Sequence, residues 1–334
     1  MSLTSIGDLA QSFVLRHRNA ELKQEMTRLT QELSTGQVAD VRQALKGNYS
    51  YLTEVERNLE VLSGYKVVTA EASIFATSIQ TTLGRFQDVG EKLANSLIVS
   101  GGSAVGATSG DTSAEARTAV DILVGVLNTR SAGRSIFGGT ATDRSPTESS
   151  DVLLSELKTA LTGATSPNDI IAAADAWFDD PAGYDAAFYR GGASSLSALR
   201  ISDTEEISFD IRATDPNFKK MLLFASLAAI ADDPAFALDE QQKAEIFTQA
   251  GTSLLGARDS ITSLRARVGF FEAQIDGTAT RNATEMTAME YEKSALLQID
   301  PYEAATKLED VQFQLQSIYA VTVRMSQLSL ANFL

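Results

Sequence analysis

The sequence predicts a mainly α-helical protein, in which the N- and C-terminal regions form a long antiparallel helical bundle and a central α+β insert interrupts it. Three observations lead to this prediction. Only 6 of the 334 residues are proline, so little interrupts long helices. Apolar residues recur at steps of three, four and seven near both ends, which is typical of helices that bury one stripe. Between about residues 140 and 239 this pattern gives way to shorter segments.

The N-terminal part is expected to form long helices. The apolar stripe of the first helix consists of Leu15, Leu22, Met26, Leu29 and Leu33. Gly36 marks its end. The second begins near Asn48 and continues for roughly 50 residues, or about 75 Å. The Gly- and Ser-rich segment 100–113 is expected to be a loop, followed by a third helix that closes at Gly133.

The middle of the chain is expected to be a compact α+β insert. The stretches DVLLSELKTAL and NDIIAAADAWF predict brief helices, while SALRISD and EEISFDIRA alternate as strands do. Trp177, the single tryptophan, lies on one face of a predicted helix and is expected in the core. The apolar run Met221–Ala231 is too short to cross a bilayer, so we expect a buried helix there.

The C-terminal part returns to the long helical pattern, with a heptad that holds from Leu254 to Leu296. In the last helix Asp300 is the expected N-cap, Pro301 takes the first helical position, and Glu303 is placed to close a capping box. Packing both ends of the chain together would bury the stripes, bring the termini to one tip and leave the insert at the far end.

This organisation predicts five segments. They are an N-terminal assembly helix at 1–40, the N-terminal part of the bundle at 41–139, the central insert at 140–239, the C-terminal part of the bundle at 240–299 and a C-terminal assembly helix at 300–334.

Composition and motifs argue against an enzyme. The net charge of -15 disfavours nucleic acid as a partner, and the absence of cysteine excludes thiol catalysis and thiolate metal sites. His17 is the only histidine and is expected on the surface, and Asp before Pro is expected to cap helices. The Gly-rich stretches lack the Gly-Lys-Ser/Thr ending of a phosphate-binding loop. We therefore expect no catalytic residue, cofactor or metal.

The terminal helices are the predicted functional surface. The chain ends in RMSQLSLANFL without a polar cap. The two terminal stripes have only each other as partners, and two helices alone leave part of each stripe exposed. We expect this exposed apolar surface to serve assembly. The predicted interface residues are Leu15, Leu22, Met26, Leu29, Leu33, Leu308, Val311, Leu315, Ile318, Met325, Leu328, Leu330, Phe333 and Leu334.

Both ends also resemble a known family. The segment MTRLTQELSTGQVADV is similar to the start of bacterial flagellins and their hook-filament junction relatives, and the last 35 residues resemble the C-terminal helix of the same group. SIFGGTATDRSP and LSLANFL resemble the junction branch more narrowly. Two features depart from the family: Phe333 stands where Tyr is usual, and residues 38–41 lack the Ala-Asp-Asp common in flagellins.

The resemblance implies a structural, non-enzymatic protein of the extracellular flagellum, exported through the flagellar type III apparatus without a cleavable signal peptide. None is visible at this N-terminus. The implied partners are further copies in a ring, the first hook-associated protein, flagellin and an export chaperone, with no nucleic acid or membrane. The alternatives are a flagellin that forms the filament itself or, with less support, a helical ligand-binding or enzymatic module.

Overall fold

The computed structural model describes residues 4–102 and 108–331, with side chains for residues 10–102 and 108–325. It is mainly α-helical with long helices and two small hairpins, which confirms the predicted fold class. The chain forms two compact units. The terminal unit holds the described residues up to Ser63 and those from Thr284 onward; the central unit is Gly64–Ala283.

The described helices are α1 (Thr4–Thr35), α2 (Val41–Ala44), α3 (Ser50–Gly102), α4 (Ser109–Leu127), α5 (Ser150–Ala160), α6 (Pro167–Asp179), α7 (Pro216–Ile230), α8 (Glu240–Leu297) and α9 (Pro301–Ala331). A π-helical turn at Pro181–Asp185 and a 3-10 turn at Pro234–Phe236 join them. Two antiparallel hairpins complete the described part, β1 (Arg130–Ser131) with β2 (Arg134–Ser135) and β3 (Leu199–Arg200) with β4 (Glu206–Ile207).

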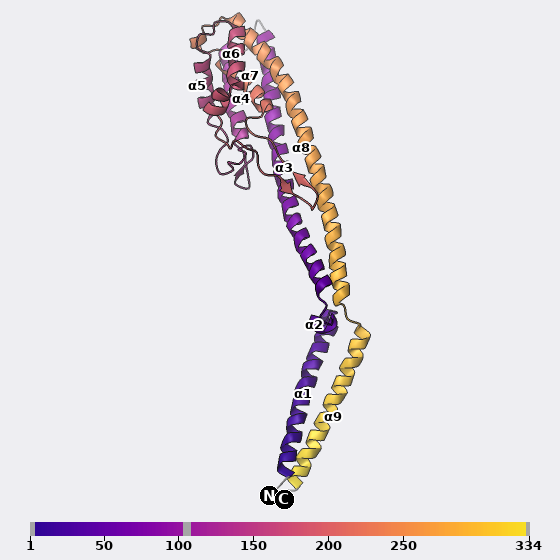
Figure 1. Ribbon diagram of the computed structural model, residues 1–334. Helices are drawn as coiled ribbons and strands as arrows, with labels where there is room; N and C mark the ends of the chain where they lie inside the picture. The colour runs from indigo at the N-terminus through magenta and orange to yellow at the C-terminus, as the bar shows by residue number, and fades with distance from the viewer. Residues whose placement is uncertain (1–3, 103–107, 332–334) are drawn as a thin grey trace. The chain divides into compact units, whose positions relative to one another are not determined.

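The terminal unit contains the α1–α9 pair. These helices lie side by side and antiparallel, with the start of α1 and the end of α9 at the same end of the pair (Figure 1). In the same unit the first turns of α3 pair with the last turns of α8. The Tyr51 hydroxyl donates a 2.7 Å hydrogen bond to Glu292, and Lys293 forms a 2.7 Å ion pair with Glu56.

In the central unit α3 and α8 continue as an antiparallel pair (Figure 1). The Gln80 amide donates to the Arg265 carbonyl at 2.8 Å, and the Arg265 guanidinium donates back to Gln80 at 3.2 Å. Further along, Gln87 donates to the Thr262 hydroxyl at 3.2 Å. Close to the end of α3 the helices approach so tightly that a Cβ on Gly251 would lie 2.9 Å from the Ala94 carbonyl oxygen.

One hydrophobic core holds the central unit together. Helix α4 packs against α7, and α7 is buried from Met221 to Ile230, which confirms the predicted buried helix. Phe218 contacts Phe86 and Phe137 at centroid distances of 5.0 and 5.1 Å in edge-to-face geometry, so it joins α7 to α3 and to the segment after β2. Trp177 packs against the same core, as expected.

Residues 140–239 contain the predicted short helices and strands, but the predicted third helix differs from expectation. Helix α4 begins at Ser109, inside the stretch expected to be a loop, because the Thr108 hydroxyl caps it by accepting from the Asp111 amide at 3.2 Å. Its other end was also predicted wrongly. The helix ends at Leu127, and Gly133 instead forms the turn of the first hairpin with φ of 79°.

Aspartates before proline cap helices, as predicted. Asp180, Asp215 and Asp233 each accept a backbone hydrogen bond two residues on. Asp300 does the same at α9, where its carboxylate accepts from Tyr302 and Glu303 amides at 2.9 and 3.2 Å. The other half of the expected capping box is wrong, since the Glu303 carboxylate turns to Lys307, 2.7 Å away.

Candidate assembly interface

The α1–α9 pair is joined by a leucine-rich seam, and the seam is the part of the predicted interface that the structure brings together. Its buried members are Leu22, Leu29, Val311 and Leu315, and Met26, Leu308 and Ile318 pack against them half-buried. Steps of three, four and seven put these side chains on one stripe of each helix. The two stripes therefore meet within a single chain.

The other predicted residues contribute less to this seam. Leu15, Leu33 and Met325 are half-buried. Leu328 and Leu330 lie in α9, where the structure describes the backbone but not their side chains. Phe333 and Leu334 lie outside the described residues.

Large apolar side chains that the heptad analysis missed remain exposed on the same pair. They are Phe13, Val14, Phe313, Val321 and Val323. They lie off the seam, so a search for heptad spacing passes over them. The sequence did contain a signal for them. On the outward side of an amphipathic helix polar residues are expected, so an aromatic or branched apolar residue at such a position indicates a surface that could be buried by a partner. These five residues are named the outer apolar set.

Polar contacts also join α1 to α9 on both sides of the leucine-rich seam. The Arg18 guanidinium donates to the Gln314 side chain at 3.4 Å, and the Lys23 ammonium lies 6.0 Å from the centre of the Tyr319 ring. Side-chain hydrogen bonds with Asn19 and Lys23 lower the pKa of Tyr319. Each edge thus ties α1 to α9 beside the seam.

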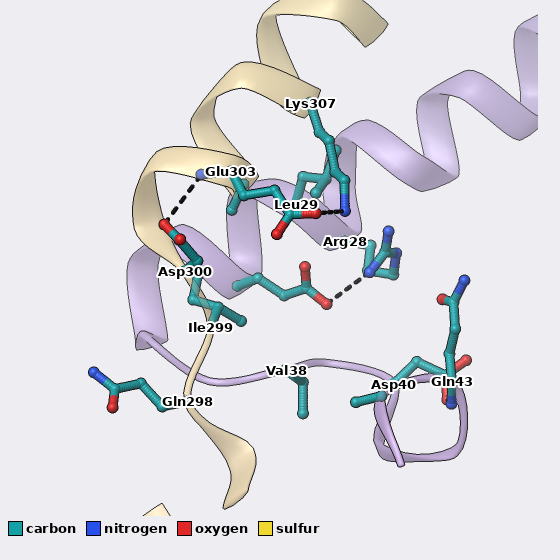
Figure 2. A pocket seen from close by; sticks show the side chains of 13 residues that line it. Arg28, Leu29, Val38, Asp40, Gln43, Gln298, Ile299, Asp300, Glu303 and Lys307 are labelled. Carbon is teal, nitrogen blue, oxygen red and sulfur yellow. Dashed lines mark hydrogen bonds and ion pairs between the residues drawn. The ribbon is translucent and has the colours of Figure 1, made fainter. Parts of the chain in front are cut away.

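A polar pocket of about 330 Å³ lies where α1 ends and α9 begins (Figure 2). Its buried acid is Glu32, which accepts hydrogen bonds from Arg28 at 2.7 Å and from the Ala39 amide at 3.1 Å. Arg28 also pairs with Glu25, and this hydrogen bond lowers the pKa of Glu25 and raises that of Arg28. The pocket is therefore lined by groups that already satisfy one another.

Two backbone hydrogen bonds cross the same end of the pair. The Val38 amide donates to the Leu297 carbonyl at 2.8 Å, and the Ile299 amide donates to the Gly36 carbonyl at 3.1 Å. Gly36 has φ of 72°, the left-handed conformation that ends α1 and that glycine adopts without strain. The segment after α1, residues 36–38, therefore pairs with the segment before α9, residues 297–299, in the manner of a short antiparallel ladder.

The α1–α9 pair is nearly neutral, although the whole chain carries a net charge of -15. Helix α1 has four acidic and four basic residues, and α9 has three acidic and two basic residues. The negative charge therefore resides elsewhere in the chain. Near-neutral helices can approach further copies without the repulsion that two strongly acidic surfaces would experience.

The described residues contain no cluster of three or more His, Cys, Asp or Glu side chains placed to hold a metal ion. His17 lies on the surface of α1, as expected, where it pairs with Glu21 at 3.3 Å. No helix in the described ranges is long and apolar enough to cross a membrane. What the interface provides is shape, apolar surface and low charge.

Comparisons with known proteins found one family match, to the C-terminal part of the chain, and one similar solved fold. Residues 254–334 match a family model described as the bacterial flagellin C-terminal helical region, which spans most of α8 and the whole described length of α9. No curated protein matches the chain. Among solved structures, the fold is similar to that of a Vibrio parahaemolyticus protein described as a flagellar hook-associated protein, with 13% identity and a TM-score of 0.50. The alignment covers 73% of this chain and 95% of that chain. The family match supports a flagellin-like protein, and the second likeness concerns the fold.

Proposed function

We propose that the protein is a structural, non-enzymatic component of the bacterial flagellum, an adaptor at the hook-filament junction that assembles through its terminal helices. One observation carries the proposal: the stretch that matches the flagellin C-terminal helical region includes α9, and α9 is paired along its length with α1. The N-terminal helix is thereby attached to the flagellin-like end of the chain.

The surface for further copies is the outside of this pair and not its seam. The seam leucines contact one another within the chain, so they hold the pair in shape. The outer apolar set remains free to be buried by a neighbour, at about 25 cal/mol per Å² of apolar surface removed from water. Because the pair carries almost no net charge, this packing should depend only weakly on salt.

Two motifs support the junction in preference to the filament. LSLANFL at the C-terminus and SIFGGTATDRSP at 135–146 resemble the junction branch. In the structure the second motif is a packed turn: Phe137 is buried, and the Thr140 amide donates to the Ser194 carbonyl at 2.9 Å. The motif therefore shapes the central unit, and the likeness of fold to a hook-associated protein agrees with the same branch.

A filament-forming flagellin is the second candidate, and a specific observation favours it. The family model that matches residues 254–334 is that of flagellins themselves. Both candidates require export to the outside of the cell and self-association, but they differ in where the copies lie. A junction adaptor occupies one short zone, whereas a flagellin continues along the filament.

The test is to delete the gene in the source organism and to label the native protein on isolated hook-basal bodies with antibody-bound gold. An adaptor predicts intact hooks, flagellin released into the medium and gold confined to the hook-filament boundary. Gold along the whole filament would assign the second candidate. A deletion strain with normal filaments would contradict both.

A further inference from the structure

Two uncharged stripes run along the outside of the central unit, one on α3 and one on α8. The α3 stripe consists of Val67, Ala70, Ile74, Thr77 and Thr81. The α8 stripe consists of Ser263, Ala266, Phe270, Ala273 and Gly277. Each repeats at steps of three and four, and all members are exposed except the half-buried Gly277. Neither line contains a charged residue, although the chain as a whole carries a net charge of -15.

The stripes lie on opposite sides of the α3–α8 pair. At 100° per residue, the α3 stripe is opposite the buried face that carries Ala76 and Leu83. The α8 stripe is likewise opposite the buried face that carries Leu264 and Val268. Since these buried faces are turned toward the partner helix and the core, the two stripes point away from each other.

The stripes also lie at the same height along the pair. Gln80 and Arg265 exchange hydrogen bonds, and Phe209 touches both Phe75 and Phe271 at centroid distances of 5.4 and 5.7 Å. Both contacts set the antiparallel register of the two helices. Ile74 of α3 is therefore within about one helical turn of the level of Phe270 in α8.

A hollow of about 240 Å³ opens beside the α3 stripe. Phe75, Leu196, Leu199 and Phe209 form its apolar lining, and the 2.8 Å ion pair between Glu71 and Arg134 lies at its edge. An apolar cavity of roughly 150 Å³ is enough to hold a benzene molecule. The hollow therefore has room for a phenyl ring, and Phe270 is the one bulky side chain in the α8 stripe.

Charges beside the stripes are complementary. Lys66 borders the α3 stripe and lies two heptads before Gln80, on the same face. Asp276 borders the α8 stripe and lies 11 residues, or about three turns, after Arg265, again on the same face. Gln80 and Arg265 are hydrogen-bonded, so Lys66 and Asp276 lie on the same side of the pair. Neither forms an ion pair with the described residues, so each is free to pair between copies.

We propose that the α8 stripe of one copy packs on the α3 stripe of a second copy, with the Phe270 ring in the hollow of its neighbour. This contact joins different faces of identical subunits, and repetition of such a head-to-tail contact produces a ring or an open helical tube. The proposal rests on the proposed self-assembly in the flagellum and specifies the lateral faces that meet in the central unit.

Cysteine cross-linking tests this contact, because the chain contains no cysteine of its own. Cells co-express Ile74→Cys and Phe270→Cys variants, and their isolated flagella are oxidised. A dimer on a non-reducing gel is expected from the mixture and from neither variant alone. Val99→Cys mixed with Phe270→Cys is the control, since Val99 and Phe270 are both 67% exposed but Val99 lies near the far end of α3. This mixture should remain monomeric.

A second pair keeps the phenyl ring. Ala70→Cys mixed with Ala273→Cys should also cross-link, whereas a dimer from one variant alone would indicate a symmetric contact and overturn the proposal. Ala70→Arg should abolish incorporation without altering the melting temperature. Asn95→Arg should incorporate normally, because Asn95 is exposed on the same face of α3 but lies 14 residues, or about 21 Å, beyond the end of the stripe. If the protein is present in flagella and neither pair cross-links, the lateral contact is wrong and the proposed function stands. If the unaltered chain is absent from flagella, the proposed function itself fails.

Discussion

Leu315 and Phe313 are two residues apart on α9, yet Leu315 is 6% exposed in the seam with α1 while Phe313 is 70% exposed on the outside. A separation of two residues rotates a helix by about 200°, so the two side chains point to nearly opposite sides. One side of α9 therefore packs against α1, and the other side, which carries Phe313, is exposed and is the side that the proposed assembly would use.

This separation predicts different outcomes for two matched substitutions. Phe313→Asp should leave the α1–α9 pair folded and should weaken incorporation into flagella. Leu315→Asp should destabilise the pair by several kcal/mol, because it buries a charge among Leu22, Leu29 and Val311. Limited proteolysis of α1 distinguishes the two: protection should be kept in Phe313→Asp and lost in Leu315→Asp. Equal protease sensitivity in both variants would contradict the assignment of faces.

Substitution by alanine should change the stability in opposite directions at two glycines of α8. A Cβ on Gly251 would meet the Ala94 carbonyl oxygen at 2.9 Å and Ile98 at 2.8 Å, so Gly251→Ala should force α3 and α8 apart and cost about 1–3 kcal/mol. Gly256 has open space around it, so Gly256→Ala should stabilise the helix by about 0.5–1 kcal/mol. Thermal unfolding should show a lower melting temperature for Gly251→Ala and a higher melting temperature for Gly256→Ala than for the parent protein. A stabilised Gly251→Ala would show that the close approach of the helices is not needed.

The start of α9 should depend on Asp300 far more than on Glu303. Asp300→Ala removes the acceptor for the Tyr302 and Glu303 amides and should cost about 1 kcal/mol. Glu303→Ala removes only an exposed ion pair with Lys307, worth about 0.3–0.5 kcal/mol. Hydrogen exchange of the first-turn amides should accelerate in Asp300→Ala only. Equal acceleration in both variants would restore the capping box that the sequence predicts.

Acid should weaken the network around Arg28. Its guanidinium stabilises the ionised Glu25 carboxylate, so the folded pKa of Glu25 lies below the ordinary value of 4.5. The unfolded chain therefore binds more protons in this range, and the stabilisation is present above pH 4.5 and lost as the pH falls through the folded pKa. Glu25 is 40% exposed, which limits the effect to at most about 1 kcal/mol.

Melting curves at pH 7 and pH 3.5 test this pH dependence. Glu25→Gln should lower the melting temperature at pH 7, and this deficit should be smaller at pH 3.5, because the unfolded Glu25 binds a proton below pH 4.5 and the stabilisation of its ionised form begins to be lost. Glu60→Gln is the control, because Glu60 is exposed on α3 and forms no ion pair with the described residues. A Glu25→Gln deficit of the same size at both pH values would refute the electrostatic explanation.

Helices were the most predictable feature of this protein. The stripes of α1 and α9 are local patterns, and Gly36 and Asp300 end and begin them as their chemistry requires. Composition misled at Ser109–Ser113, where small polar residues suggested a loop. There a single hydroxyl, that of Thr108, satisfies the first-turn amide of Asp111, and the helix begins despite the composition.

The candidate interface was predictable only in part. The assignment of the heptad residues to an interface between copies stays a prediction. Heptad spacing did place Leu22 and Leu29 on one stripe and Val311 and Leu315 on another, and the two stripes meet in the seam. It could not decide whether their partner was the same chain or another, because both arrangements bury the same side chains. It also could not identify Phe313, which belongs to no stripe and becomes conspicuous only through its exposure.

By itself the sequence determined which segments are helical, where most of them begin and end, and which side of each is apolar, because these properties depend on neighbours within a few turns. Only the tertiary structure decided which residues of α1 and α9 meet in the seam and that Phe270 and Ile74 lie on opposite outer faces at one height. Those relationships join residues far apart in the chain. They are set by the packing and hydrogen bonds between helices, such as that from Gln80 to Arg265, and leave no periodic trace in the sequence.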